Sequence, residues 1–295
     1  MSAAQRDEVQ DVELAVLVGA ARSGTTLLRL LLDSHPEIGS PAEAGLPGLM
    51  AHMAGVWVTI DADLTSGSGP EPPTARHRTE PDGRIVVADA VEDDAAAAAR
   101  EAWLDRLPAD AHAWIRSAMA RAMSRYCARA GKRLYVDKSL DSVHHLPLVH
   151  RLFPEARYVL LFRHVMDTVA SGIEASPWGF QAYGYTPFVQ RSPENFVAAL
   201  VNYWLTHVDG ALRWQEEHPG LCHGVRYEDL VTDPLTVVAE IFSFLGVEHD
   251  AGVLNRAFDH ARGAKGPGDY KVTFTSQVDP GSIGHGKRVP VDMVA

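Results

Sequence analysis

The segment ELAVLVGAARSGTTLLRLLLDSHPEI, residues 13–38, decides the fold. It opens with an apolar run too short for a helix, passes through a turn bounded by Gly19 and Gly24, and resumes as leucines at helical spacing. A glycine-bounded turn between a strand and a helix exposes backbone N–H groups, and the helix dipole adds positive potential there. The segment therefore predicts a site for phosphate or sulfate.

Arg22 distinguishes this turn from the loop that binds nucleoside triphosphates with Mg. The two glycines match the spacing G-x-x-x-x-G, but Thr25 and Thr26 stand where that motif requires Lys and then Ser or Thr. Arg22 instead offers a planar fork of donors that suits a tetrahedral oxyanion. On the loop alone, the alternative is an ordinary strand-to-helix turn with a solvated arginine.

The strand-to-helix pattern recurs along the chain, at residues 132–152, 156–175 and 223–247. Strands that alternate with helices predict an α/β fold with a mostly parallel central sheet flanked by helices. Ligands in such folds bind beyond the carboxyl ends of the strands. We expect a single domain over residues 1–295, with a helical and loop insertion on the substrate side at about residues 50–130.

Composition narrows the partners and the cellular location. The formal net charge of −11 argues against a nucleic-acid binder, since such proteins carry a basic stripe. No apolar run reaches the roughly 18 residues of a membrane span, so we expect no membrane association and a cytoplasmic protein. Cys127 and Cys222 form no spacing motif, and His144 and His145, with His150 beyond them, give no two-turn histidine pair completed by a carboxylate, so no metal site is predicted.

A second anion-binding element is predicted at residues 156–175. Arg163 stands directly after an apolar strand, and Ser171 follows it by eight residues, about two helical turns. A guanidinium and a hydroxyl placed in this way could hold one anion together. Taken singly, Arg163 would be a surface residue and Ser171 a small polar filler, so the pair gains meaning only beside the first loop.

These residues resemble the sulfotransferases that use 3′-phosphoadenosine 5′-phosphosulfate (PAPS), in particular the tyrosylprotein-type and polyketide-type enzymes. ARSGTTLL, residues 21–28, is similar to the family's P-R-S-G-T-T-L-L, with Ala21 in place of the proline. Arg163 and Ser171 keep the spacing of the family's second element, although Met166 departs from a common proline nearby. The resemblance continues over residues 226–247 and 270–290, and it implies a P-loop-like sulfotransferase fold.

The resemblance also implies the donor site, with PAPS as donor, 3′-phosphoadenosine 5′-phosphate (PAP) as product and no metal required. The residues that would bind the 5′-phosphosulfate are Arg22, Ser23, Gly24, Thr25 and Thr26. Those that would bind the 3′-phosphate are Arg163 and Ser171, with Tyr227 near the nucleotide. The family often closes a C-terminal loop over the cofactor, and the basic residues of that loop would be Lys271, Lys287 and Arg288. The alternative is that these three are solvated charges.

Two further residues are catalytic candidates. Glu43 follows Arg22 by 43 − 22 = 21 residues, and the resemblance makes it the base that takes the proton of an acceptor hydroxyl. A solvated loop carboxylate is the alternative. Lys138 follows a strand and is one of only five lysines. The resemblance makes it the donor to the oxygen that bridges the sulfuryl group and the departing nucleotide. The alternative is an ordinary exposed lysine. Other family branches use a histidine base, for which the candidates are His35, His52, His144 and His145.

The predicted function is sulfuryl transfer from PAPS to a hydroxyl of a small-molecule or carrier-bound acceptor, as on an acyl carrier protein, in bacterial biosynthesis. One alternative is a kinase-like phosphotransferase that uses ATP and Mg, favoured by the apolar run that ends at Asp89. Another is a non-catalytic nucleotide-binding module. The last residues, VPVDMVA, stop where relatives continue, so we expect a chain trimmed from a longer protein. The identity of the acceptor and the oligomeric state stay open.

Overall fold

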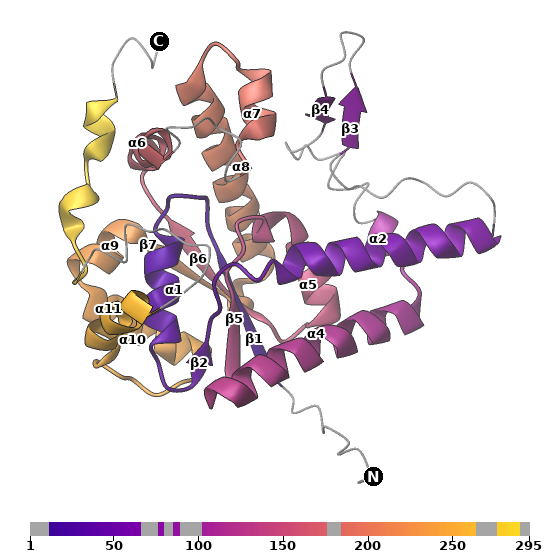
Figure 1. The fold of residues 1–295 in the computed structure, drawn as a ribbon, viewed down its shortest axis with the longest axis horizontal. Helices are drawn as coiled ribbons and strands as arrows, with labels where there is room; N and C mark the ends of the chain where they lie inside the picture. The colour runs from indigo at the N-terminus through magenta and orange to yellow at the C-terminus, as the bar shows by residue number, and fades with distance from the viewer. Residues whose placement is uncertain are drawn as a thin grey trace.

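The computed structural model describes residues 12–65, 76–79, 85–88, 102–175, 184–263 and 276–289. Its centre is a five-stranded sheet in the order β2-β5-β1-β6-β7, in which every pairing is parallel (Figure 1). The strands are β1 Glu13–Val18, β2 Ile38–Gly39, β5 Leu134–Asp137, β6 Arg157–Phe162 and β7 Cys222–Arg226. The predicted mostly parallel sheet is confirmed, and the carboxyl ends of its strands meet at one edge.

The apolar run of β1 is continuous because both faces of the sheet are covered. Leu14 and Val16 face one hydrophobic core, whereas Ala15 and Leu17 face a second. The helices of the first core are α2 Leu46–Thr65, α4 Ala109–Ala130, α5 Leu146–Leu152 and α8 Phe196–Glu217. Those of the second are α1 Thr25–Asp33, α9 Tyr227–Thr232, α10 Pro234–Leu245 and α11 Val253–Gly263.

A third apolar cluster lies around the carboxyl ends of β1 and β6. It joins Ala20 and Ala21, which follow β1, to α6 Val165–Ala175, α7 Thr186–Arg191 and the first half of α8. Val289, next to the short helical turn η5 His285–Arg288, packs into the same cluster. Segments that are far apart in the sequence therefore meet where ligands are expected.

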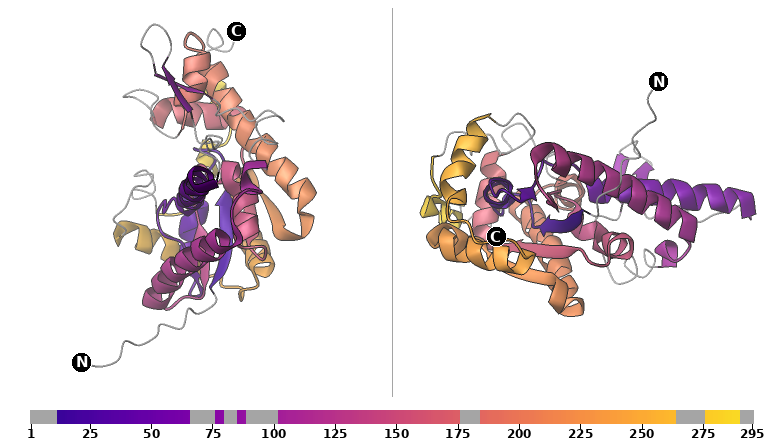
Figure 2. Two further views of the ribbon diagram at one scale, coloured as in Figure 1. Left: turned by 90° about the vertical axis from the view of Figure 1, so that its right-hand side faces the viewer. Right: turned by 90° about the horizontal axis from the view of Figure 1, so that it is seen from below.

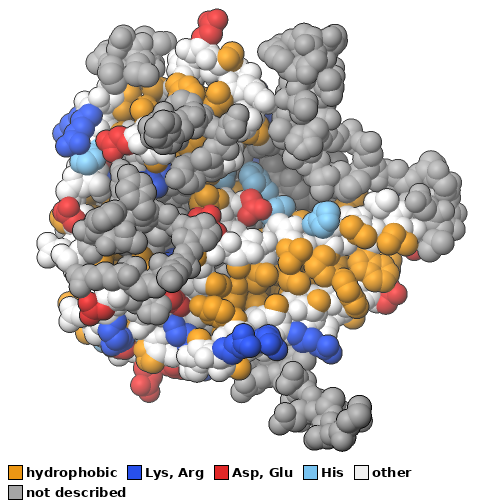
Figure 3. All heavy atoms as spheres, viewed as in Figure 1, with side chains coloured by type: hydrophobic (Ala, Val, Ile, Leu, Met, Phe, Trp, Pro, Cys, Tyr) orange, Lys and Arg blue, Asp and Glu red, His pale blue; other side chains and the backbone are white. Residues whose placement is uncertain are grey.

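The region of the predicted insertion contributes both core and surface. Met50 of α2 and Met123 of α4 belong to the same hydrophobic core as β1, and the two helices lie against each other (Figure 2). Apolar side chains are also exposed here (Figure 3): Leu49, Val56, Ile60 and Trp114. None of the helices in the described ranges has the length and apolarity needed to cross a membrane.

The strand that, in the kinase alternative, would carry a magnesium-binding aspartate does not belong to the central sheet. β4 Ile85–Ala88 pairs antiparallel with β3 Arg76–Thr79 in a separate two-stranded sheet. Asp89 itself lies outside the described residues. The apolar run that favoured a kinase is thus not a strand of the central sheet.

Candidate active site

The carboxyl edge of the sheet brings most of the predicted site residues together. Each follows a different strand: Glu43 comes after β2, Lys138 after β5, the loop with Arg22 after β1, Arg163 after β6 and Tyr227 after β7. Because the strand order is β2-β5-β1-β6-β7, the acid–base candidates lie on one side of the loop and the second anion element on the other.

The loop after β1 is a tight turn. The Ser23 N–H donates to the Ala20 carbonyl at 3.1 Å, and Arg22 has φ 68°, as the third residue of a type II turn requires. Gly24 has φ 99°, and a Cβ there would lie 2.6 Å from Cε2 of the Tyr227 ring. Gly24 is therefore needed both for its backbone conformation and for the close approach of Tyr227.

The two predicted anion elements touch each other. Arg22 Nε donates to Ser171 Oγ at 3.2 Å, and Arg163 Nη1 donates to the Arg22 carbonyl at 2.8 Å. Ser23, by contrast, is 1% exposed, and its hydroxyl donates within the loop to Ala20 at 2.6 Å. Arg22, Arg163 and Ser171 thus form one polar cluster between the loops before α1 and α6 and the middle of α6.

Arg163 is a cation enclosed by the fold. It is 6% exposed, its guanidinium lies 4.3 Å from the centroid of the Tyr227 ring, and Nη2 donates to the Ser282 carbonyl at 3.2 Å. Burial lowers the pKa of Arg163, while Tyr227 and nearby carboxylates act to raise it. Its buried Nε has no hydrogen-bond partner among the described residues. A buried cation with spare donors favours an anionic ligand.

A cavity of about 510 Å³ joins these groups. The predicted residues that line it are Arg22, Gly24, Thr25, Thr26, Arg163, Ser171 and Tyr227. The rest of the wall comes from four segments: Leu27 of α1, Glu174 of α6, Phe258 of α11, and the C-terminal residues Gln277, Val278, Asp279, Gly281, Ser282 and His285. Tyr227 Oη and Ser282 Oγ lie 2.7 Å apart, so the C-terminal segment is attached to the site.

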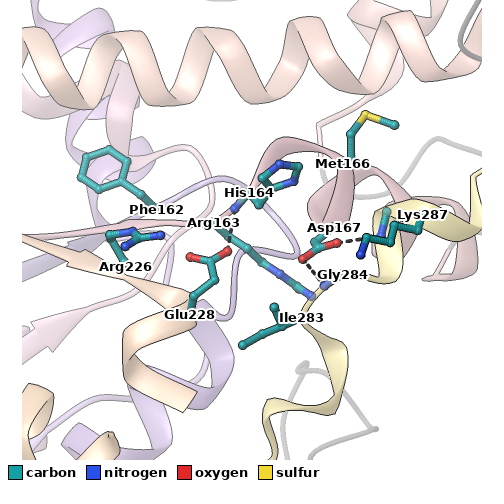
Figure 4. Close-up of a pocket in the computed structure, with 11 residues that line it drawn as sticks. Phe162, Arg163, His164, Met166, Asp167, Arg226, Glu228, Ile283, Gly284 and Lys287 are labelled. Carbon is teal, nitrogen blue, oxygen red and sulfur yellow. Dashed lines mark hydrogen bonds between the residues drawn. The ribbon is translucent and has the colours of Figure 1, made fainter. Parts of the chain in front are cut away.

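A second cavity, of about 520 Å³, is also lined by Arg163 (Figure 4). Its wall includes Lys287, and Asp167 accepts the N–H groups of Gly286 at 2.6 Å and Gly284 at 2.8 Å. Burial acts to raise the pKa of Asp167, but these two N–H groups bring it below its ordinary value. Asp167 therefore fastens the C-terminal segment to α6.

Of the predicted C-terminal cations, the described Lys287 and Arg288 do not line the cavity shared by Arg22 and Arg163. Lys287 lines the second cavity, Arg288 is exposed, and Lys271 lies outside the described residues. Their predicted contact with the nucleotide stays a prediction.

Glu43 and Lys138 form an ion pair, in which Lys138 Nζ donates to Glu43 Oε1. The side chain of Lys138 is 3% exposed and that of Glu43 is 34% exposed. Burial lowers the pKa of Lys138, although Glu43 acts to raise it. The carboxylate is accessible from solvent, while the ammonium is held inside, which is a suitable arrangement for a base and an electrostatic stabiliser.

Two residues that the sequence analysis missed support this pair. Ser139 Oγ accepts the Gly45 N–H at 3.0 Å and donates to Asp137 Oδ1 at 2.7 Å, which ties the Glu43 loop to the end of β5. Asp137 is 1% exposed, and burial raises its pKa to about 6. The signal was available, because Asp137 ends a buried strand and Ser139 follows it by two residues.

The candidate histidines lie in different surroundings. His35 is 1% exposed, with Nε2 2.9 Å from the Glu248 carbonyl and its ring against Phe242, as a core histidine. His145 Nε2 lies 3.4 Å from Asp141 Oδ2, and the His144 ring lies 5.2 Å from that of His207. The side chain of His52 is exposed on α2.

Comparison with known proteins identifies the family. Residues 15–251 match the model of the sulfotransferase family. The chain belongs to this family. Among the described residues of this sulfotransferase, no three His, Cys, Asp or Glu side chains gather where a metal ion could bind.

Two curated relatives are similar in sequence. The nodulation protein NoeE of Sinorhizobium fredii is 32% identical over 188 residues, which are 63% of this chain and 36% of NoeE. A putative protein-tyrosine sulfotransferase of Caenorhabditis briggsae is 25% identical over 244 residues, 82% of this chain and 69% of that protein. The chain thus spans little more than a third of NoeE.

Two solved structures share the fold. The sulfotransferase domain of the Synechococcus PCC 7002 olefin synthase has a TM-score of 0.55 at 23% identity, with 98% of this chain and 95% of that chain covered. The sulfotransferase domain from the curacin biosynthetic pathway has a TM-score of 0.50 at 20% identity, with 92% and 85% covered. The P-loop-like sulfotransferase fold is confirmed.

Proposed function

We propose that this sulfotransferase transfers a sulfuryl group from PAPS to a hydroxyl of a small-molecule or carrier-bound acceptor in bacterial biosynthesis. The observation that carries the proposal is the cavity shared by Arg22 and Arg163, with the Glu43–Lys138 pair at the neighbouring strand ends. PAPS would supply a sulfuryl group attached to a phosphate that leaves readily.

The residues that line the cavity shared by Arg22 and Arg163 suit the two charged ends of this donor. The left-handed backbone at Arg22 and Gly24 and the first N–H groups of α1 suit the 5′-phosphosulfate. Arg163, with a buried unpartnered Nε, and Ser171 suit the 3′-phosphate. Tyr227, which lines the same cavity, would lie against the nucleoside.

Glu43 and Lys138 would divide the chemistry of the transfer. Glu43 accepts the proton of the acceptor hydroxyl as its oxygen bonds to sulfur. Lys138 stabilises the negative charge left on the phosphate oxygen when the bond from that oxygen to sulfur breaks. Lys138 can donate to that oxygen from inside the fold, while the more exposed Glu43 meets an acceptor that arrives from solvent.

The acceptor class is supported by the names of similar proteins. Two fold neighbours are sulfotransferase domains of an olefin synthase and of a curacin biosynthetic pathway. A hydroxyl on a small molecule or on an acyl carrier protein is the acceptor that we propose. Incubation with isotope-labelled PAPS and extracts of the source organism, followed by mass spectrometry of sulfated products, identifies it.

The donor is tested by calorimetry with PAP, AMP and Mg-ATP. PAP should bind at least about tenfold more tightly than AMP, because only PAP carries the 3′-phosphate for Arg163 and Ser171. Tight binding of Mg-ATP with no preference for PAP would favour the kinase alternative instead. Binding of PAP without transfer to any acceptor would leave the non-catalytic module.

A further inference from the structure

One segment of α8 contacts the loops that follow three different strands. Tyr203 Oη accepts the Ala21 N–H at 3.1 Å, after β1. Trp204 Nε1 donates to the Arg163 carbonyl at 2.9 Å, after β6. The ring of His207 also approaches the loop after β5, with Nε2 3.3 Å from the Leu140 carbonyl.

Each of these backbone groups adjoins a proposed site residue. Ala21 precedes Arg22, the carbonyl bonded by Trp204 belongs to Arg163 itself, and Leu140 follows Lys138 by two residues. One rigid helix thus touches all three loops whose side chains would act on the donor.

The turn itself is held firmly. Tyr203 is 2% exposed, and its ring packs against Tyr185 at 4.7 Å, Phe188 at 5.4 Å and His207 at 4.1 Å between centroids. His207 Nδ1 lies 2.9 Å from the Tyr203 carbonyl. Burial lowers the pKa of His207, and a neutral imidazole can donate to only one of its two carbonyl neighbours. Removing one partner of a hydrogen bond in such buried surroundings is especially destabilising, because the other partner is left buried and unsatisfied.

We propose that the turn of α8 from Tyr203 to His207 is a common brace for the donor site, and that Tyr203 and Trp204 are positioning residues of the reaction. The inference rests on the proposed PAPS-dependent function. The brace keeps the three loops in the binding-competent arrangement before the donor arrives, so little affinity is lost to ordering them.

Ala21 gives the brace a specific chemical signature. Residues 20–23 form a type II turn in which Ala21 is the second residue, a position that proline suits well. The family motif P-R-S-G-T-T-L-L, which residues 21–28 resemble, has proline at this position. Proline has no N–H, so only a non-proline residue such as Ala21 can donate to Tyr203.

The first test compares Tyr203→Phe with Tyr158→Phe. Tyr158 is also buried, but its hydroxyl has no hydrogen-bond partner among the described residues, so it is a matched control. Tyr203→Phe should weaken PAP binding about tenfold in calorimetry, while Tyr158→Phe stays within about twofold of wild type. Equal effects of the two substitutions would overturn the brace, because they would reflect general loss of packing.

The second test compares Trp204→Phe with Trp214→Phe. Trp214 is buried on the same helix, and its Nε1 has no partner among the described residues. We expect Trp204→Phe to reduce the advantage of PAP over AMP, since it frees the backbone of Arg163. The control should keep that advantage, and an unchanged advantage in Trp204→Phe would contradict the role of Trp204.

The third test is rescue by proline. In Tyr203→Phe the Ala21 N–H is left buried without an acceptor, and Ala21→Pro removes that donor. The double variant should therefore bind PAP more tightly than Tyr203→Phe alone, while Ala21→Pro by itself binds more weakly than wild type. Purely additive losses in this cycle would overturn the hydrogen bond as the cause.

Hydrogen exchange separates failure of the brace from failure of the proposed function. Tyr203→Phe should speed amide exchange at residues 20–24 in the nucleotide-free protein, whereas Tyr158→Phe should not. If the wild-type protein binds no PAP but the two variants still differ in exchange in this way, the PAPS donor is refuted and the brace is kept. Protein that binds PAP and shows no difference would refute the brace.

Discussion

The two sides of β1 differ in how they are closed. On the β6–β7 side, Arg163 is 6% exposed and is covered by Tyr227, by the Ser282 segment and by α8. On the β2–β5 side, Glu43 is 34% exposed beside the buried Lys138. We propose that the closed β6–β7 side retains a charged ligand, while the open β2–β5 side meets a partner that arrives from solvent. Substitutions on the two sides should therefore change different measured quantities.

The largest effects are expected on the open side. Glu43→Ala and Lys138→Ala should each lower turnover roughly 100-fold or more, because a base or a stabilising charge is lost from the transition state. PAP affinity should change little in both variants. Turnover is measured as labelled aryl sulfate formed from PAPS and a test phenol, or as labelled sulfate released when water is the acceptor. Glu216→Ala, an exposed carboxylate on α8, is the control, and unchanged turnover in Glu43→Ala would remove Glu43 as the base.

The next largest effect is expected on the closed side. Arg163→Ala should weaken PAP binding about 50-fold and AMP binding much less, because AMP lacks the phosphate that Arg163 is proposed to hold. Calorimetry on both ligands measures the difference. Arg226→Ala is the matched control, since Arg226 lines the second cavity with its side chain 68% exposed. A larger loss in Arg226→Ala would move the nucleotide to that cavity.

Gly24→Ala tests the contact between the loop and the closed side. The added Cβ would overlap the Tyr227 ring, and the φ of 99° is strained for any side chain. We expect about tenfold weaker PAP binding. Gly131→Ala, also at positive φ but with open space around the new Cβ, supplies the control for backbone strain. Equal PAP affinity in both variants would show that the Tyr227 contact is unimportant.

The smallest effect concerns the pH dependence of the open side. Burial lowers the pKa of Lys138 from its ordinary 10.5, so its charge is lost at a lower pH than for an exposed lysine. Turnover that needs the Lys138 ammonium is therefore at its full value below this pKa and falls as the pH rises through it. In Glu43→Gln the falling limb of residual turnover should move to lower pH, because Glu43 acts to raise this pKa. A limb that stays in place would contradict the coupling.

The sequence predicted the strand ends better than their surroundings. The residues after β1, β5 and β6 follow short apolar runs that mark where buried strands stop, whereas Tyr227 after β7 was predicted only from the resemblance to the family. Tyr203, Trp204, Asp167 and Ser282 were missed, since an aromatic or polar residue at helical spacing looks like ordinary core or surface. The hydrogen bond from Ala21 to Tyr203 spans 182 residues, and no local pattern encodes such a contact.

A crystal structure with PAP bound would test the two-anion site. We expect one nucleotide in the cavity between Arg22 and Arg163, with its 5′-phosphate on the N–H groups of residues 22–26 and its 3′-phosphate on Arg163 and Ser171. A nucleotide bound instead in the second cavity beside Lys287, or with its two phosphates away from both arginines, would contradict it.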